Sequence, residues 1–125
     1  MVSSRINSER VWFLDLDGTI FVHNKYLTLR NDEFDEILPG VLDFFRRLNA
    51  KDKIIIISSR SDVFRELTIR SLEHYNIRYD HVILNMPKGP RIIVNDTKVD
   101  GTDTAYAINL TRNSPFAIPD KYYKI

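Results

Sequence analysis

The chain alternates short apolar runs with longer segments in which apolar residues recur at helical spacing. This alternation is typical of a parallel sheet whose strands are joined by helices. The short runs are rich in β-branched residues, which favour strands over helices. They predict an α/β fold with a mostly parallel five-stranded sheet, its strands at residues 11–14, 54–57, 81–84, 91–94 and 105–110.

Two segments have the period of an amphipathic helix. The first begins after Pro39-Gly40 and ends near Asn49, with apolar residues at Val41, Leu42, Phe45 and Leu48. The second is capped by Ser61 or Asp62 and stops near Asn76, with an apolar stripe formed by Phe64, Leu67, Thr68, Leu72 and Tyr75. Residues 19–38 have a mixed pattern, for which we expect a short hairpin at 19–29 and a solvated acidic loop at 32–36.

Length and composition indicate one soluble globular domain. We assign residues 1–125 to a single domain, with a core at about 10–112 and a C-terminal tail at 113–125. Eighteen basic and 17 acidic residues leave a net charge of +1, which argues against bulk attraction to nucleic acid or an anionic membrane. The sequence has no cysteine, no apolar run that could span a bilayer and a polar start, so we expect a cytoplasmic protein.

Polar residues follow three of the predicted strands at their carboxyl ends. Asp15 and Asp17 follow the first strand, Ser58 the second and Asp96 the fourth. Ligands of open α/β sheets bind outside the carboxyl ends of the strands, so these residues are expected to converge on one pocket. Taken singly the signals are weak, because Asp17-Gly18 is also ordinary turn chemistry and Ser58 is suited to cap the next helix.

The sequence Asp15-Leu16-Asp17-Gly18-Thr19 after an apolar strand resembles the first motif of the haloacid dehalogenase (HAD) superfamily of phosphatases. Counterparts of the other three motifs follow in order: Ser58 after four isoleucines, then Lys88, then Asp96 with Asp100. The resemblance spans residues 11 to about 100. It implies a three-layer αβα, Rossmann-like fold and a Mg²⁺-dependent phosphomonoesterase.

By this resemblance, Asp15 is the nucleophile that forms an aspartyl-phosphate, and Asp17 is the general acid and then the general base. Magnesium is expected on Asp15, on Asp17 through its backbone carbonyl, and on Asp96, with Asn95 and Asp100 as possible hydrogen-bond partners of these ligands. The phosphoryl oxygens are expected to be held by Ser58, Ser59, Arg60 and Lys88.

The sequence departs from the HAD pattern in two places. Asn95 stands where many relatives have Gly or a second Asp, so the metal site has one charge fewer than in relatives with paired carboxylates. Lys88 precedes Asp96 by only eight positions, so Lys98 competes with it for the phosphate-contacting role. His23, His74 and His81 share no metal-ligand spacing and are interpreted as surface or packing residues.

The intervals between the motifs are filled by a helix and a strand or loop, which leaves no room for a cap domain. The chain therefore looks like a capless HAD member, similar to small phosphatases that act on sugar phosphates or in capsular polysaccharide synthesis. A small phosphate ester is the expected substrate. Capless members either have open sites or borrow a neighbouring subunit of a homo-oligomer as a lid.

Three other functions are compatible with parts of the sequence. A polynucleotide 3′-phosphatase is suggested by the basic residues Arg60, Arg65, Arg70 and Lys88, against which the near-neutral charge argues. A non-catalytic phospholigand-binding module would keep the fold without turnover, but degenerate members tend to lose one of the two aspartates. A response-regulator receiver is disfavoured because its acceptor aspartate follows the third strand rather than the first.

Overall fold

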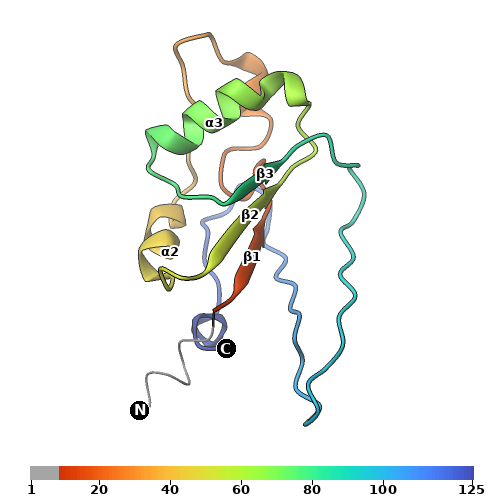
Figure 1. Ribbon diagram of the computed structural model, residues 1–125. Coiled ribbons are helices and arrows are strands. Elements are labelled where there is room, and N and C mark those ends of the chain that lie inside the picture. Colours follow the sequence, from red (N-terminus) through yellow and green to blue (C-terminus); the bar gives the residue numbers. More distant parts are fainter. Residues whose placement is uncertain (1–8) are drawn as a thin grey trace.

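The computed structural model describes residues 9–125 and is a small α/β protein with a three-stranded parallel sheet (Figure 1). Its elements follow in the order β1 (Val11–Leu14), the 3₁₀ helix η1 (Lys25–Thr28), α2 (Val41–Arg47), β2 (Lys53–Ile57), the 3₁₀ helix η2 (Asp62–Phe64), α3 (Arg65–His74), β3 (His81–Ile83) and the 3₁₀ helix η3 (Asp120–Tyr123). The first three predicted strands and both predicted helices are confirmed. Among the described residues, no helix has the length and apolar character that crossing a membrane requires.

The strands lie in the order β1-β2-β3, with both pairs parallel. Leu14 is in register with Ile56, and Ile57 with Ile83, so the carboxyl ends of all three strands share one edge of the sheet. Both crossovers step in the same direction along the sheet. Because such crossovers are right-handed, α2 and α3 are placed on the same face.

The core lies between that face and the two helices. Alternate residues of the strands point into it, and Ile54 and Ile56 are fully buried. They pack in one cluster with buried residues from both helices and from the C-terminal segment, among them Phe44, Leu72 and Phe116.

Helix α2 buries Val41 and Phe44, whereas Leu42, which we expected on its apolar face, is exposed. The reason is the C-terminal segment, which was predicted to be a strap or a loose tail and packs against α2. Phe44 contacts the rings of Trp12, Phe116 and Tyr123, with centroids 4.7–6.0 Å apart. These aromatic contacts set the rotation of the short helix.

The opposite face of the sheet stays partly open. Val11 and Phe13 are each 52% exposed, and Ile83 on β3 is 40% exposed. In the described chain the sheet therefore has one face covered by helices, and the predicted third layer is not formed. The sheet also has three strands rather than the predicted five.

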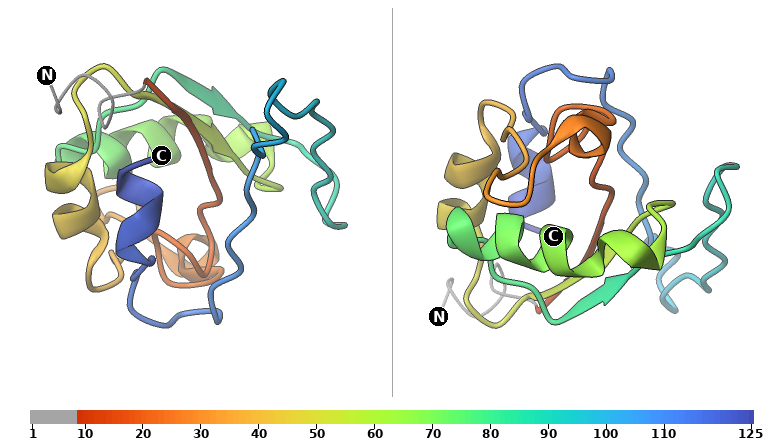
Figure 2. Two further views of the ribbon diagram at one scale, coloured as in Figure 1. Left: turned by 90° about the horizontal axis from the view of Figure 1, so that it is seen from below. Right: turned by 90° about the horizontal axis from the view of Figure 1, so that it is seen from above.

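The predicted strands at 91–94 and 105–110 lie in a long segment that projects from the rest of the molecule in both views of Figure 2. We call residues 87–109 the arm. Only seven residues separate Ile83 from Arg91, whereas a crossover that returns to the start of a parallel sheet needs a dozen or more. Residues 91–94 therefore run away from the carboxyl edge of the sheet and cannot form a parallel fourth strand.

The segment between β1 and α2 packs into the core without the predicted hairpin. Ile20, Phe21 and Leu38 are buried, and isolated bridges join Phe21 to Asp17 and to Ile37. In the acidic loop Asp32, Glu33 and Glu36 are exposed, whereas Asp35 is fully buried. This buried carboxylate was not predicted, and its partner lies in the candidate site.

Candidate functional site

Asp15 and Asp17 lie immediately after β1, at the carboxyl edge of the sheet. Between them Leu16 is fully buried, and its carbonyl oxygen accepts hydrogen bonds from the backbone N–H groups of Thr19, Ile20 and Phe21 at 2.9–3.1 Å. Gly18 permits this tight turn, because its φ of 88° is rarely adopted by other residues. The turn anchors the two aspartates at the end of the strand.

Both aspartates line a cavity of about 640 Å³, a volume within the range of small-molecule sites. Its walls come from the ends of β1 and β2, the segments around η1 and η2, the first residues of the arm, and Arg112 just after the arm. The lining residues are Asp15, Asp17, His23, Asn24, Tyr26, Leu27, Ser59, Ser61, Phe64, Pro87, Lys88, Arg91 and Arg112. Three cationic side chains thus share one cavity with two carboxylates.

Asp15 is the more accessible of the two, with 37% of its side chain exposed. Its oxygens have two long contacts: the Thr19 hydroxyl donates at 3.3 Å and Arg91 Nη2 donates at 3.3 Å. The same Arg91 nitrogen also donates to the Ile57 carbonyl at 3.2 Å. Arg91 therefore divides its hydrogen bonds, and Asp15 is held weakly enough for an incoming group to compete.

Asp17 is held much more firmly. Arg60 Nε donates to Asp17 Oδ2 at 3.1 Å, and Arg60 Nη2 donates to Asp17 Oδ1 at 3.0 Å, a two-pronged pair. The same guanidinium bonds both oxygens of Asp35, at 3.1 and 2.5 Å, and donates to the Thr68 hydroxyl at 2.9 Å. One fully buried arginine thus pairs with two carboxylates.

The pKa values follow from these contacts. Burial alone lowers the pKa of Arg60, but the hydrogen bonds and charges of Asp17 and Asp35 raise it by more, so its pKa lies above the ordinary value. Burial, followed by the charge of Asp17, raises the pKa of Tyr26, whose ring lies 4.1 Å from the Arg60 guanidinium carbon. The Tyr26 phenol is therefore a protonated hydrogen-bond donor in the cavity.

The residues predicted to bind phosphate are divided by the structure. Ser59 and Lys88 line the cavity. Ser58 is buried, and its hydroxyl accepts a hydrogen bond from the Arg60 backbone N–H at 3.0 Å. The Arg60 side chain is committed to Asp17 and Asp35. The second-strand motif thus contributes one cavity-lining serine and one ion-paired arginine.

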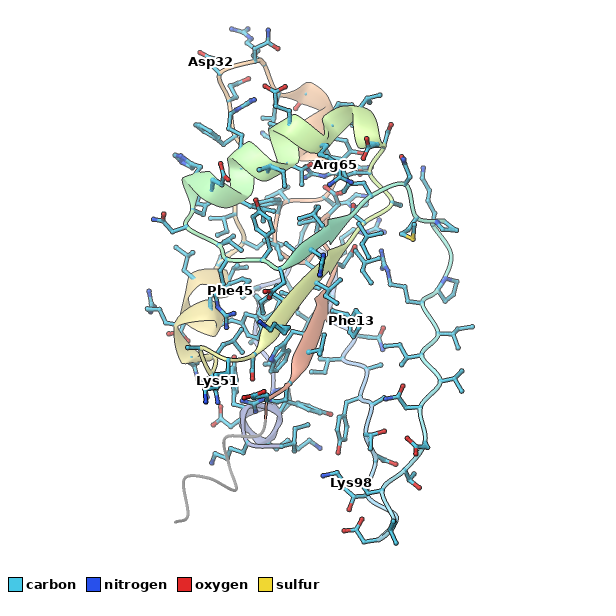
Figure 3. The ribbon with its side chains drawn as sticks, viewed as in Figure 1. Phe13, Asp32, Phe45, Lys51, Arg65 and Lys98 are labelled. Carbon is cyan, nitrogen blue, oxygen red and sulfur yellow. The ribbon has the colours of Figure 1, made fainter. Side chains whose placement is uncertain are left out.

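The residues of the predicted fourth motif lie on the arm, outside the cavity lining. Asp96 and Asp100 are exposed, and Asn95 Nδ2 donates to the Thr104 hydroxyl at 3.4 Å. Lys98 lies at the tip of the arm (Figure 3). The reason is again the short link from β3, which sends the chain away from the carboxyl edge before these residues are reached.

Several lining residues were missed from the sequence. His23, interpreted as a surface or packing residue, lines the cavity, and its backbone N–H donates to Asn113 Oδ1 at 2.8 Å. Within the described chain, His23 Nδ1 is buried and has no hydrogen-bond partner. Arg91 was placed in a strand and Arg112 at the end of the core, and no local pattern indicated that both would line the cavity that contains Asp15.

The carboxylates fit a magnesium ion in part. Asp15 offers accessible hard oxygen ligands, and magnesium is commonly held by one or two carboxylates with water completing its shell. Arg60 bonds the side-chain oxygens of Asp17, not the backbone carbonyl that was expected to bind the metal, and Asp96 is on the arm. Over residues 9–125 no group of three or more His, Cys, Asp or Glu side chains could hold a metal ion.

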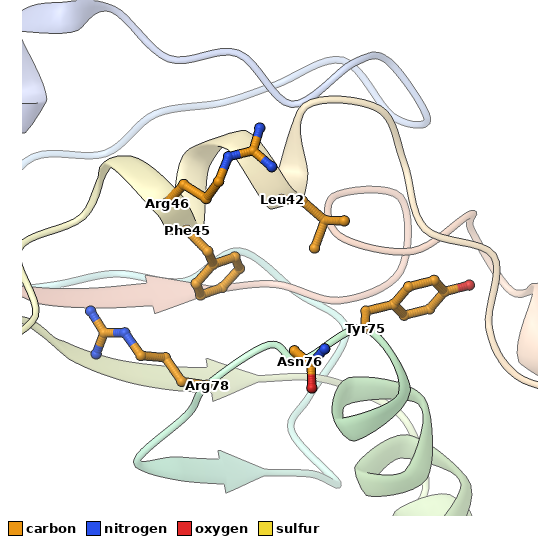
Figure 4. A pocket seen from close by; sticks show the side chains of 6 residues that line it. All are labelled: Leu42, Phe45, Arg46, Tyr75, Asn76 and Arg78. Atoms are coloured by element: carbon orange, nitrogen blue, oxygen red, sulfur yellow. The ribbon is translucent and has the colours of Figure 1, made fainter.

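A smaller cavity of about 290 Å³ lies between α2 and the end of α3 (Figure 4). Its cations are engaged elsewhere: Arg46 pairs with Asp43, and Arg78 donates to the carbonyls of Asn49 and Asp52. The cavity at Asp15 is therefore the candidate site.

Comparisons with protein-family models, with curated proteins and with solved structures each found no match.

Proposed function

We propose that the protein is a phosphomonoesterase that works through an aspartyl-phosphate on Asp15, with a sugar phosphate or related small ester as substrate. The observation that carries the proposal is the single cavity in which Asp15 and Asp17 lie with Lys88, Arg91 and Arg112. A phosphate dianion needs cations close to a carboxylate nucleophile, because otherwise the two anions repel each other. The HAD-like spacing of the aspartates supports the same assignment.

In the first step, an Asp15 oxygen attacks phosphorus, a new P–O bond forms, and the ester P–O bond breaks. Arg91 now bonds Asp15 at 3.3 Å, and we assign it to swing onto the phosphoryl group as the dianion enters. Lys88 and Arg112 supply the other positive charges, and Ser59 supplies a hydroxyl donor. In the second step water attacks the same phosphorus and the bond to Asp15 breaks.

Asp17 is assigned to protonate the leaving oxygen and then to accept a proton from water. Both its oxygens are bonded to Arg60, so this role requires the pair to open at one oxygen. Magnesium, when bound by Asp15 and Asp17, would screen charge between carboxylate and phosphate. The cavity volume of about 640 Å³ suits a small ester.

A second candidate function is a phospholigand-binding module without turnover. It is favoured by the arginine partners of both aspartates, which hold the nucleophile and the acid in resting ion pairs. A polynucleotide 3′-phosphatase is less well supported, because Arg60, a cation that suggested it, has a fully buried side chain.

The test is phosphate release from an aryl phosphate, with and without Mg²⁺, by the parent and by Asp15→Asn. Asp43→Asn on α2 is the matched control, since Asp43 is exposed and lies outside the cavity. We expect metal-dependent turnover that Asp15→Asn abolishes and Asp43→Asn preserves. Equal turnover in parent and Asp15→Asn would contradict the nucleophile. Phosphate binding without turnover on a panel of sugar phosphates would favour the binding module.

A further inference from the structure

The arm exposes more apolar surface than a free segment is expected to show. Ile92, Val94 and Val99 are 85%, 89% and 109% exposed, and Ile93, Tyr106 and Ile108 are also exposed. Contiguous exposed apolar residues of this kind mark surfaces that bind another protein. The apolar side chains that predicted strands at 91–94 and 105–110 are therefore left largely uncovered in the described chain.

The backbone of the arm is equally unpaired. Within residues 87–109, the backbone–backbone hydrogen bonds run between Lys98 and Thr102 and between Gly101 and Lys98, which close the turn at the tip. The two extended legs make no such bonds in the described structure. Extended chain with unpaired N–H and C=O groups is a template for pairing with another strand.

The sheet offers a complementary surface. β1 is an edge strand, and Val11 and Phe13 on its open face are each half-exposed. The residues that flank the arm are fastened at the carboxyl edge of the sheet: the Met86 N–H donates to the Ser58 carbonyl after β2, and the Asn113 N–H donates to the Gly18 carbonyl in the turn after β1. Even so, no backbone hydrogen bond joins the arm to its own β1 over residues 9–125.

We propose that a second copy of this chain covers the arm, with residues 91–94 of each arm lying antiparallel along β1 of the other copy. An unpaired apolar strand and an unpaired strand edge on one chain satisfy each other reciprocally in a two-fold dimer. The pairing would extend each three-stranded sheet and shield Phe13 and Ile92 from water. It also gives residues 91–94 the strand neighbour that their sequence predicts.

The distribution of charge supports a second copy of the chain as the partner and an antiparallel direction of residues 91–94 along its β1. The tip carries Asp96, Asp100 and Asp103 against one lysine, all exposed. Exposed Lys51 and Lys53 lie at the amino end of β2, where Lys53 Nζ is 3.8 Å from Asp80 Oδ1, and Figure 3 shows the tip of the arm at the same end of the molecule as Lys51. An antiparallel arm therefore brings acidic tip to basic edge, and a net charge of +1 leaves little repulsion between copies.

The test is the mass of the full chain in solution, by light scattering and sedimentation over a wide concentration range. The parent should be a dimer, and Ile92→Asp/Val94→Asp should weaken self-association on the order of 100-fold or more, because four apolar side chains per dimer lose their burial. Val63→Asp is the control, since Val63 is 81% exposed in η2 and should leave the dimer unchanged. Circular dichroism checks that both variants fold.

Hydrogen exchange gives an independent reading. In the dimer, the amides of residues 91–94 should be protected, and the double variant should lose that protection. The proposal would be overturned by a monomeric parent, whether its arm amides exchange rapidly or are protected. Protected amides in a monomer would mean that the arm folds onto its own sheet. A dimer that persists in the double variant would overturn it as well. None of these readings depends on phosphatase activity, so the proposed function stands or fails separately.

Discussion

Removing the Arg60 side chain should be among the most damaging single changes in this protein. Its guanidinium is fully buried and bonds Asp35, which is also fully buried, and Asp17, which is 12% exposed. In Arg60→Met a side chain of similar length fills the space but leaves two carboxylates without their cation. Thr68 also loses a donor to its hydroxyl.

Breaking a buried ion pair by removing one partner costs about 3–5 kcal/mol, because the remaining charge stays desolvated. We expect Arg60→Met to lower the free energy of unfolding by this amount. With a denaturant slope of about 1.5 kcal/mol per molar urea, the unfolding midpoint should fall by about 2–3 M. A domain with a total stability of about 5–15 kcal/mol keeps a folded majority after this loss, except towards the lower end of that range.

The assay is urea unfolding followed by circular dichroism. Because Arg60→Met alone could be largely unfolded, Arg60→Met/Asp35→Asn is measured beside it. Neutralising Asp35 removes one of the two stranded charges, so the double variant should be more stable than Arg60→Met. Arg47→Met is the matched surface control, since the Arg47–Asp120 pair is 42% and 75% exposed and should change the midpoint little.

The reasoning would be refuted if Arg60→Met cost less than about 1 kcal/mol, the size expected of an exposed pair. It would also fail if Asp35→Asn added its own cost to that of Arg60→Met. Additive losses would mean that the two residues stabilise the protein independently rather than through their mutual contact.

Three further predictions concern the site and the fold. Lys88→Ala should lower kcat/KM about 10²–10³-fold while Lys98→Ala leaves it unchanged, because of these two lysines only Lys88 lines the cavity. Equal losses of kcat/KM in steady-state assays would contradict the assignment of Lys88 to the phosphoryl group. Gly40→Ala should lower the melting temperature far more than Gly101→Ala, because both glycines have φ near 88° but only at Gly40 would the added methyl strike a backbone carbonyl, that of Phe116. Equal melting temperatures of the two variants would contradict this. Burial and then the charge of Asp17 raise the pKa of Tyr26, so the folded state holds that proton more tightly and the free energy of unfolding should fall as pH rises above about 10. Tyr26→Phe should remove one late-titrating phenol from the tyrosinate absorbance curve, and an unchanged curve would contradict the raised pKa.

Local pattern was sufficient for the elements whose stability is largely local or nearest-neighbour. Four consecutive isoleucines favour a strand, and Pro39-Gly40 and Ser61 mark helix starts, all of which the structure confirms. The end of the second helix was also predictable, because Asn76 tolerates the left-handed conformation, here φ 56°. The pairing of Asp15 with Asp17 in one cavity followed from their position after a buried strand.

The sequence did not reveal which polar residues would meet. Asp35 looked like part of a solvated acidic loop, yet it is buried because the segment after η1 folds back onto α3. There Ser71 of α3 and Arg60, which follows β2, bond its carboxylate. Arg60 looked like a phosphate ligand because its true partners could not be found from the sequence. Asp35 and Asp17 lie 25 and 43 positions away, and no spacing rule links them to Arg60. Long-range ion pairs depend on packing, not on sequence neighbourhood.

The arm shows the division between the two levels most directly. The sequence by itself determined that residues 91–94 and 105–110 prefer extended backbone, since β-branched composition acts through each residue's own dihedral angles and side-chain packing. Only the tertiary structure decided where that strand could pair, because a link of seven residues cannot recross a parallel sheet. That chain path keeps Asp96 out of the cavity, brings Arg91 to Asp15, and leaves an apolar strand without a partner in the described chain.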